Sequence, residues 1–339
     1  MVRAFLTERQ QSRVLTTWLT GLTLATVMHL LSPRLEAPQC VVLEEAEGGP
    51  APSCNATNSL PTFTNSHTSV VEALLEGPLE ATDRRLLQWV AEGGGGRVFP
   101  PSTLPYNITD HNVGGWEDSG VWKFYVKAIN RYFGKKEGGF FVEAGALDGV
   151  ILSATLTLEQ NQGWQGLLVE PRPDIFQQLL DKHRKAHAAR FCLSEKPYPH
   201  QTSFWLSPDY FKQSVAFSAV SSQLLDKTSP ELRETGNVMT VHCIPLVTLL
   251  RALHISHVDL FVLDVEGAEW GVIELFPFDQ ITVNMLAVER KKKGDADRAA
   301  FIQLVQSKGF TLAHSLSEDF IFIRNSSQID IDPALYLVN

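Results

Sequence analysis

The sequence has little cysteine and comparatively little basic charge. Four cysteines in 339 residues are too few for a fold built on disulfides. Lysine and arginine number 29 against 38 aspartates and glutamates, which leaves a net charge of −9. This acidic balance excludes a general nucleic-acid partner, since such a protein needs a basic face against the phosphates. No spacing of cysteine and histidine matches a zinc site, so we expect no metal.

Long apolar runs are also scarce, and the one candidate for a membrane span is Val14–Leu31. It holds 18 residues without Asp, Glu, Lys or Arg, at the short end of what can cross a bilayer. Arg3, Arg9 and Arg13 precede it, opposed only by Glu8. The positive-inside rule therefore predicts a cytosolic tail over residues 1–13, a signal anchor over 14–31 and a lumenal remainder. A cleaved signal peptide and a buried soluble helix are the alternatives, although prolines crowd the region where cleavage would fall.

Residues 32–66 are predicted to form a disordered stalk, because their prolines, glycines, acids and small polar residues cannot bury enough apolar surface to offset ordering. Cys40 and Cys54 lie in this stalk, where pairing within the chain or between chains is open. Asn55, Asn107 and Asn325 begin Asn-X-Ser/Thr sequences in polar stretches and are predicted glycosylation sites. These features favour a type II glycoprotein in a membrane of the secretory pathway.

Residues 67–137 are predicted to form a helical segment ahead of the main domain. The apolar pattern from Ser69 to Glu92 indicates a helix that Pro78 divides in two. Trp122–Phe133 has the apolar spacing of an amphipathic helix, which we expect to pack on the main domain.

The main domain is predicted over residues 138–324, followed by a C-terminal tail over 325–339. Short apolar runs alternate there with helix-length segments, which indicates an α/β fold with a mostly parallel sheet and helices on both faces. The stretch from Glu195 to His242 breaks this alternation, and we expect an inserted hairpin and a loop near the site. The predicted strands are Phe140–Ala144, Gly166–Val169, Arg190–Leu193, Val258–Asp264, Met285–Glu289 and Asp319–Ile323. The predicted helices are Ser153–Asn161, Asp174–His187, Leu246–His254, Ala268–Leu275 and Ala296–Lys308.

The strongest functional signal follows the first of these strands. Glu143 closes the apolar strand, and the chain then turns through Gly145, Asp148 and Gly149. The glycines allow a sharp turn and a close approach of the backbone to a ligand. Ligands of doubly wound sheets bind beyond the carboxyl ends of the strands, where this turn lies. The spacing fits neither the dinucleotide motif nor a P-loop, and acids beside phosphates would repel them, so a cationic ligand with an amino-acid part is favoured.

Acids also close two later strands. Glu170 ends the second strand, 27 residues after Glu143, where a carboxylate can accept hydrogen bonds from both ribose hydroxyls. Asp264 closes another apolar strand and is expected to point into the ligand crevice. Glu266 and Glu269 follow it, and an alternative interpretation is that both are ordinary acids at a helix N-terminus. For Glu266 the two interpretations are about equally favoured.

The three segments Glu-Ala-Gly-Ala-Leu-Asp-Gly, Val-Glu-Pro and Asp-Val-Glu-Gly-Ala-Glu, in this order, resemble the FkbM-type methyltransferase domain over residues 138–324. The likeness implies a Rossmann-like class I fold with a seven-stranded sheet that binds S-adenosylmethionine. Within the family, the predicted anchor and stalk are most similar to the Star type of animal membrane proteins, which carry the domain in the secretory lumen.

The resemblance also implies a role for each site residue. Glu143, Gly145, Asp148 and Gly149 would form the methionine side of the cofactor site, and Glu170 would hold the ribose. Asp264 would face the site of methyl transfer. Leu193 and Ser194 would lie near the adenine. Asp148 stands where many bacterial relatives carry a different residue, and Glu289–Lys293 is unusually basic, so the acceptor specificity is open.

Some residues near the predicted core have more ordinary interpretations. Cys192 and Cys243 are by default buried thiols, with a disulfide in an oxidising lumen as the alternative. His242 and His314 are only distant candidates for a general base. The basic run Arg290–Lys293 is typical of a solvated loop, although it could meet an anionic glycan or a lipid headgroup.

Two functions are compatible with these features. The first is methyl transfer from S-adenosylmethionine to an oxygen of a glycan or small-molecule acceptor, with Asp264 or Glu266 as the base. The second is implied by the likeness to the Star type: a non-catalytic escort that moves membrane-bound growth-factor precursors from the endoplasmic reticulum to the Golgi and endosomes, with a membrane protein as its cargo.

Overall fold

The computed structural model describes residues 79–108, 120–134, 136–206, 222–291 and 294–326, all in the second of two units of the chain, residues 61–339. The predicted cytosolic tail, anchor and stalk lie outside the described residues, as do most of the C-terminal tail and the first half of the helix predicted from Ser69. Within the described ranges, no helix is long and apolar enough to cross a membrane.

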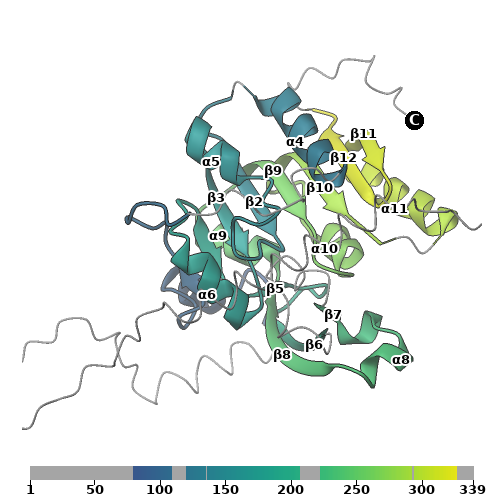
Figure 1. The fold of residues 1–339 in the computed structure, drawn as a ribbon, viewed down its shortest axis with the longest axis horizontal. Coiled ribbons are helices and arrows are strands. Elements are labelled where there is room, and N and C mark those ends of the chain that lie inside the picture. The colour runs from purple at the N-terminus through teal and green to yellow at the C-terminus, as the bar shows by residue number, and fades with distance from the viewer. Residues whose placement is uncertain (1–78, 109–119, 135, 207–221, 292–293, 327–339) are drawn as a thin grey trace, which may run out of the picture. The chain divides into compact units, whose positions relative to one another are not determined.

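An eight-stranded mixed sheet forms the centre of the described fold (Figure 1). Its order is β1-β4-β3-β2-β9-β10-β12-β11; the run from β4 to β10 is parallel, and β1, β12 and β11 are antiparallel to their neighbours. The chain order reverses between β2 and β9, which makes this edge a topological switch point. The strands are β1 (Val98–Phe99), β2 (Phe140–Ala144), β3 (Gln165–Val169), β4 (His187–Ala189), β9 (His257–Leu263), β10 (Thr282–Glu289), β11 (Phe310–Leu316) and β12 (Asp319–Arg324).

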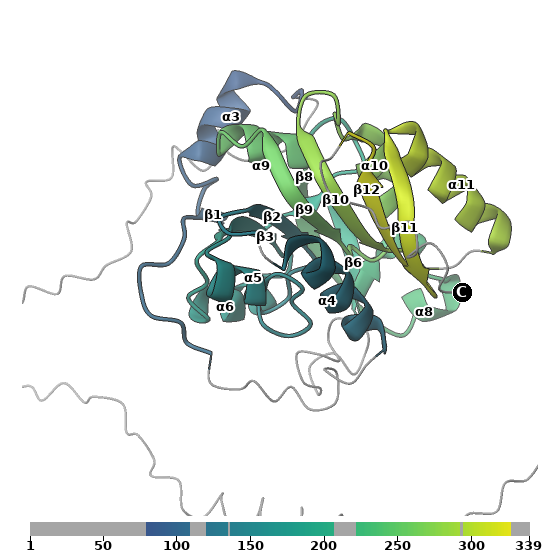
Figure 2. The ribbon, with the colours of Figure 1, turned by 90° about the horizontal axis from the view of Figure 1, so that it is seen from above.

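Helices cover both faces of this sheet (Figure 2). Successive strand residues point to opposite faces, so Val142 of β2 joins one apolar cluster and Phe141 the other. The first cluster takes in residues of α3 (Arg84–Ala91), α9 (Leu246–Ala252), α10 (Glu269–Leu275) and α11 (Asp295–Ser307). The second takes in residues of α4 (Gly120–Phe133), α5 (Leu156–Gln162) and α6 (Pro173–Asp181). The predicted α/β architecture with two covered faces is confirmed.

A second sheet of four strands, in the order β5-β8-β6-β7, stands beside the first. It realises the expected insertion, in which β6 pairs antiparallel with both β7 and β8. A 3₁₀ turn (Leu225–Lys227) and a short helix, α8 (Pro230–Arg233), join β7 to β8. The strands are β5 (Cys192–Leu193), β6 (His200–Leu206), β7 (Ser222–Leu224) and β8 (Asn237–Ile244).

The structure corrects three predictions in this region. The strand predicted at Arg190–Leu193 is wrong: His187–Ala189 pairs with β3, whereas Cys192–Leu193 pairs with β8 in the second sheet. The helix predicted over Asp174–His187 ends at Asp181, since His183 takes a left-handed φ of +56° that α-helix cannot continue through. Cys192 and Cys243 are not free thiols but form a disulfide between β5 and β8.

The sheet also has more strands than the seven expected. β1 adds an antiparallel edge beside β4. β11 was not predicted because its residues, FTLAHSL, show no clean alternation of apolar and polar side chains.

One buried carboxylate ties the amino ends of three strands together. Asp259 of β9 accepts hydrogen bonds from the backbone N–H of Phe140 (3.1 Å), the Lys136 ammonium (2.7 Å) and the Asn284 amide (3.0 Å). These partners come from β2, from the turn before it and from β10. The network fixes the starts of the strands whose opposite ends form the pocket described below.

Replacing Asp259 tests the contribution of this carboxylate to stability. Asp259→Ala leaves the part-buried Phe140 N–H without its acceptor and separates the Lys136 ammonium from its counter-charge. We expect the free energy of unfolding to fall by about 3 kcal/mol, measured by urea denaturation. Asp279→Ala, at an exposed position, is the matched control and should change it by less than about 0.5 kcal/mol. Equal effects at the two positions would contradict this account of Asp259.

Candidate functional site

A pocket of about 430 Å³ opens at the carboxyl ends of the parallel strands. Its wall is built from the residues at and after the ends of β2, β3 and β9, from β10 and from β5, with single side chains from α4, β6 and β7. This is the crevice at which ligands of doubly wound sheets bind, and its volume is typical of a small-molecule site.

Glu143 lies at this crevice and joins β2 to the start of α5. Its carboxylate accepts hydrogen bonds from the Thr155 hydroxyl (2.6 Å), the Ser153 hydroxyl (2.9 Å) and the Ala154 N–H (2.8 Å). Burial raises the pKa of Glu143, while the nearby Arg184 and these three donors oppose the shift. Residues 153–155 are therefore held as a loop, and the helix predicted from Ser153 begins only at Leu156.

Gly145 marks the point where three strands come closest. Its N–H donates to the Val169 carbonyl of β3 (3.0 Å), and the Asp264 N–H donates to the Ala144 carbonyl (3.0 Å). A β-carbon on Gly145 would lie 1.9 Å from the Asp264 carbonyl oxygen, and its φ is +86°. Only glycine meets both conditions.

Asp148 and Gly149 do not line the pocket but stabilise the conformation of the loop that does. The Asp148 carboxylate accepts from the N–H groups of Val150 (3.0 Å) and Ile151 (2.8 Å) and lies 3.6 Å from the Lys182 ammonium. Gly149 turns the chain with a φ of +76°, and its carbonyl accepts a hydrogen bond from Arg184.

Arg184 is a member of this network that the sequence did not indicate. Its buried guanidinium pairs with Glu159 (3.1 Å) and donates to the hydroxyls of Thr155 (3.2 Å) and Ser153 (3.3 Å). It thus holds the loop that carries Gly149 against the start of α5. Arg184 is a basic residue that follows a helix, and nothing in its local sequence distinguishes it from a solvent-exposed arginine.

Glu170 lines the pocket at the end of β3. One carboxylate oxygen accepts from the Leu147 N–H (3.1 Å) and the other from the Arg172 N–H (3.0 Å). Burial raises the pKa of Glu170 to about 7. Each oxygen keeps further acceptor capacity, so the carboxylate can still receive ligand hydroxyls.

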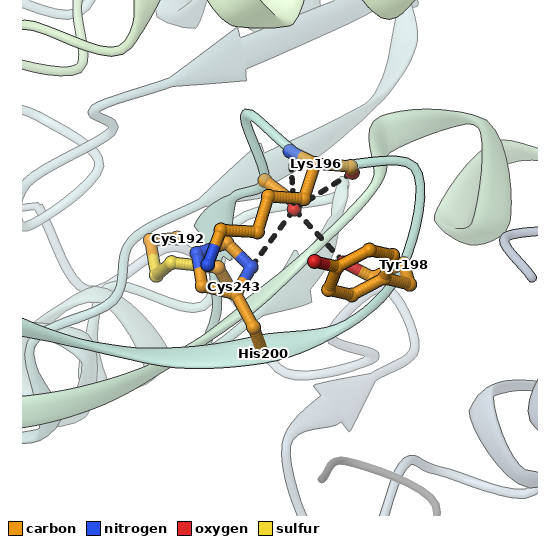
Figure 3. Close-up of a disulfide and its surroundings, with 6 residues drawn as sticks. Cys192, Lys196, Tyr198, His200 and Cys243 are labelled. Atoms are coloured by element: carbon orange, nitrogen blue, oxygen red, sulfur yellow. Dashed lines mark hydrogen bonds between the residues drawn. A yellow bond between two sulfur atoms is a disulfide. The ribbon is translucent and has the colours of Figure 1, made fainter. Parts of the chain in front are cut away.

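The side of the pocket predicted to hold adenine is apolar. Phe191, Cys192 and Leu193 line it, together with Phe204 and Leu224 of the second sheet; we call these five residues the pocket wall. Ser194 is not among the residues that line the pocket. Its hydroxyl lies within hydrogen-bond distance of the carbonyls of Lys196 and Tyr198 and of His200 Nδ1, inside the turn beside the disulfide (Figure 3).

The opposite end of the pocket is rich in carboxyl groups. Asp264, Glu266 and Glu289 line it, along with Tyr125 and Lys291. Burial, followed by repulsion from Glu289 and Glu266, raises the pKa of Asp264 well above its usual value. Burial also raises the pKa of Glu289, to about 7. Glu266 takes a left-handed φ of +57° and forms an ion pair with Lys291.

The sequence analysis missed two acids of this region, Glu289 and Asp319, and a third acid, Glu269, has a structural role. Glu289 closes β10, and Asp319, whose pKa burial raises to about 6, stands opposite it across the β10–β12 ladder. Glu289 closes an apolar strand as Asp264 does, and this signal could have identified it. Glu269 accepts from the N–H groups of Val265 (3.2 Å) and Gly267 (3.0 Å) at the start of α10, as the alternative interpretation for this residue proposed.

Other sequence candidates lie away from the pocket. His242 and His314 do not line it. Asn107 and Asn325 are exposed, as a glycan attachment requires, and Asn55 lies outside the described residues. Among the residues that the structure describes, no group of three or more histidines, cysteines or acids could hold a metal ion.

The strand order and the pocket at the switch point define a Rossmann-like α/β protein. The methyltransferase FkbM domain matches residues 143–315, half of the chain, and begins at Glu143. The chain belongs to the FkbM methyltransferase family. No curated protein matches it, so the finer likeness to the Star type stays a prediction.

Solved structures of similar topology are distant. A TehB-like S-adenosylmethionine-dependent methyltransferase from Corynebacterium glutamicum has 10% identity and a TM-score of 0.31, over 60% of this chain and 87% of its own. A methyltransferase from Pyrococcus furiosus has 9% identity and a TM-score of 0.31, over 71% and 96%. The human methyltransferase 10 domain containing protein has 10% identity and a TM-score of 0.32, over 75% and 98%. Scores this low say nothing about the activity of this chain.

The contact at Gly145 can be tested against a second glycine. Gly145→Ala places a methyl group on the Asp264 carbonyl, so we expect insoluble protein or a loss of more than about 3 kcal/mol in the free energy of unfolding. Gly138 has a similar φ of +64° but nothing within 4 Å of an added β-carbon. Gly138→Ala should therefore cost only about 1 kcal/mol. Thermal and urea unfolding measure both, and equal costs would contradict the steric account.

The buried carboxyl groups predict that stability falls as pH rises. Glu289 has a folded-state pKa of about 7, above its ordinary value of 4.5, so its protonated form favours folding. That contribution is complete below pH 4.5 and is lost as the pH rises through 7. We expect a lower melting temperature at pH 8 than at pH 5. At pH 8, Glu289→Gln should raise the free energy of unfolding by on the order of 2 kcal/mol and the melting temperature with it.

The control for this titration is Glu274→Gln, which alters an exposed acid. It should leave the melting temperature unchanged at both pH values. A Glu289→Gln protein with the same pH dependence as the unmodified chain would show that Glu289 titrates normally.

Proposed function

We propose that this protein is a methyltransferase that uses S-adenosylmethionine and methylates an oxygen of a glycan or small-molecule acceptor. One observation carries the proposal: within the range that matches the FkbM domain, Glu143, Gly145, Glu170 and Asp264 line a single pocket at the switch point of the sheet. Separate strands supply these residues, so their convergence is a property of the fold rather than of one motif.

The pocket fits this cofactor in shape and charge. One end offers the Glu170 carboxylate, with acceptor capacity for ribose hydroxyls, next to the apolar pocket wall for adenine. The middle offers the backbone of residues 144–147 at the Gly145 turn. The excess of carboxyl groups suits a ligand that carries a sulfonium and an ammonium group.

When bound, S-adenosylmethionine supplies an electrophilic methyl group. Asp264 lies at the end of β9 in the carboxyl-rich part of the pocket, and its raised pKa lets it hold a proton taken from an acceptor hydroxyl. Glu266 is the alternative base: burial raises its pKa, and its ion pair with Lys291 opposes the shift. The protein's main contribution is to hold acceptor and donor in line and to exclude water.

We further propose that this chemistry takes place in the lumen of the secretory pathway, on a type II membrane protein. The buried disulfide supports an oxidising compartment, and the exposed Asn107 and Asn325 are compatible with glycosylation. The membrane anchor and the role as an escort of membrane-protein cargo rest on residues 14–66 and on the Star-type likeness, and stay predictions.

Calorimetric titration of the full chain with S-adenosylmethionine tests the proposal. We expect saturable binding, and Glu170→Ala should weaken it at least about tenfold, because hydrogen bonds to a charged group contribute about 1.5–3 kcal/mol. The exposed Glu274→Gln is the matched control and should bind as the unmodified chain does. Absence of binding by a folded, oxidised protein would refute the proposed function.

A further inference from the structure

The backbone of the second sheet joins the main body at a short ladder between β5 and β8, which we call the neck, while Phe204, Leu224 and Val241 of this sheet also pack in the first apolar cluster. The chain leaves the main body at β5 and returns at the end of β8, directly before α9. Here β5 and β8 share only two residue pairs, Cys192 with Cys243 and Leu193 with Ile244. One further backbone bond, from the Ser194 N–H to the Ile244 carbonyl (3.0 Å), extends this ladder.

The disulfide lies at the first of these pairs. Cys192 and Cys243 are 51 residues apart in sequence, so the bond closes a loop that contains β6, β7 and α8. Around it, His200 stands opposite Cys243 in the β6–β8 ladder, and its ring contacts the Ser194 hydroxyl at 3.0 Å (Figure 3). Among the residues that the structure describes, this disulfide is thus the covalent cross-link between the two strands of the neck.

The neck is also part of the pocket. Phe191, Cys192 and Leu193 line it from β5 and the residue before β5, and Phe204 and Leu224 line it from strands beyond the neck. The relative position of these two groups of side chains depends partly on how β5 and β8 are held together and partly on the packing of Phe204 and Leu224 in the first apolar cluster. Movement at the neck would therefore open or distort the pocket wall while leaving β2, β3 and β9 in place.

We propose that the Cys192–Cys243 disulfide is a redox switch of this pocket, in which reduction by a dithiol releases the pocket wall and weakens ligand binding. The two cysteines are positioning residues, and the inference rests on the proposed function only for the identity of the ligand, S-adenosylmethionine. Cys192 is the one of the pair that lines the pocket, while the side chains are otherwise buried, at 6% and 2% exposure. A reductant consequently reaches the bond from the pocket.

The reaction is a two-electron thiol–disulfide exchange. A thiolate of the dithiol attacks the Cys192 sulfur, the S–S bond breaks, and Cys243 leaves as a thiolate that takes up a proton. The second thiol of the reductant then attacks the mixed disulfide, releases Cys192 as a thiol and closes the reductant's own disulfide. Oxidation by a disulfide of the same class reverses these steps.

The test compares the oxidised full chain with chain reduced by dithiothreitol, with complete reduction verified by thiol alkylation and mass spectrometry. Calorimetry with S-adenosylmethionine measures affinity, and hydrogen exchange measures the opening of Phe191–Leu193, β6 and β8 against β2 and β3. We expect affinity to fall at least tenfold and exchange to rise only around the neck. Circular dichroism should show that the secondary structure is retained.

A double variant separates this bond from the other cysteines. Cys192→Ser combined with Cys243→Ser should bind like the reduced chain, and dithiothreitol should not change it further, which excludes an effect through Cys40 or Cys54. If the double variant does not fold, the affinity and the hydrogen exchange of the reduced chain decide whether the disulfide is a switch.

The outcomes are distinguishable. Unchanged affinity after complete reduction overturns the switch, and so does global unfolding, which would make the bond a stability element only. Absence of binding in the oxidised state refutes the proposed function instead. Hydrogen exchange then decides the inference: exchange that rises around the neck supports release of the pocket wall, and unchanged exchange overturns it.

Discussion

The site depends on one close approach of backbones, that of the turn after β2 to the end of β9 at Gly145. An added β-carbon would lie 1.9 Å from the Asp264 carbonyl oxygen, so the two strand ends meet at a distance that leaves room only for glycine. The same turn bonds to β3 through the Val169 carbonyl. Since the carboxyl ends of parallel strands share one edge, this contact brings Glu143, Glu170 and Asp264, far apart in sequence, around one pocket.

The buried carboxyl groups of the pocket are stabilised in two different ways. Glu143 is surrounded by three hydrogen-bond donors and lies near Arg184, so its charge is compensated and it acts as part of the scaffold. Burial raises the pKa of both Asp264 and Glu289, and repulsion adds to the shift, from Glu289 at Asp264 and from Asp319 at Glu289. The carboxylate at Glu143 is therefore compensated by its hydrogen bonds, whereas the carboxyl groups at Asp264 and Glu289 have raised pKa values that favour a bound proton, which suits a cofactor end and a reaction end.

Local pattern predicted the main sheet better than its surroundings. Apolar runs that end in an acid identified β2, β3 and β9, because a strand buried on both faces is continuous in sequence and its end is marked by the first polar side chain. The same logic failed at Arg190–Leu193, where an apolar run is shared between β4 and β5 of two sheets. Arg184 and Asp319 were missed because each acts on the site only through partners distant in sequence, whereas Glu289 ends an apolar strand and carried the same local signal as Asp264.

The sequence by itself determined the α/β class, the switch-point turn at Gly145 and the acids at the ends of the strands. The class follows from the spacing of apolar residues along strands and helices, and the turn and the acids follow from short runs of consecutive residues. Only the tertiary structure decided which of these acids are compensated, that Ser194 turns away from the pocket, and that Cys192 bonds to Cys243. The reason is physical. Burial, repulsion between carboxyl groups and the pairing of thiols depend on distances across the fold, and residues 51 positions apart acquire such distances only when the sheets pack.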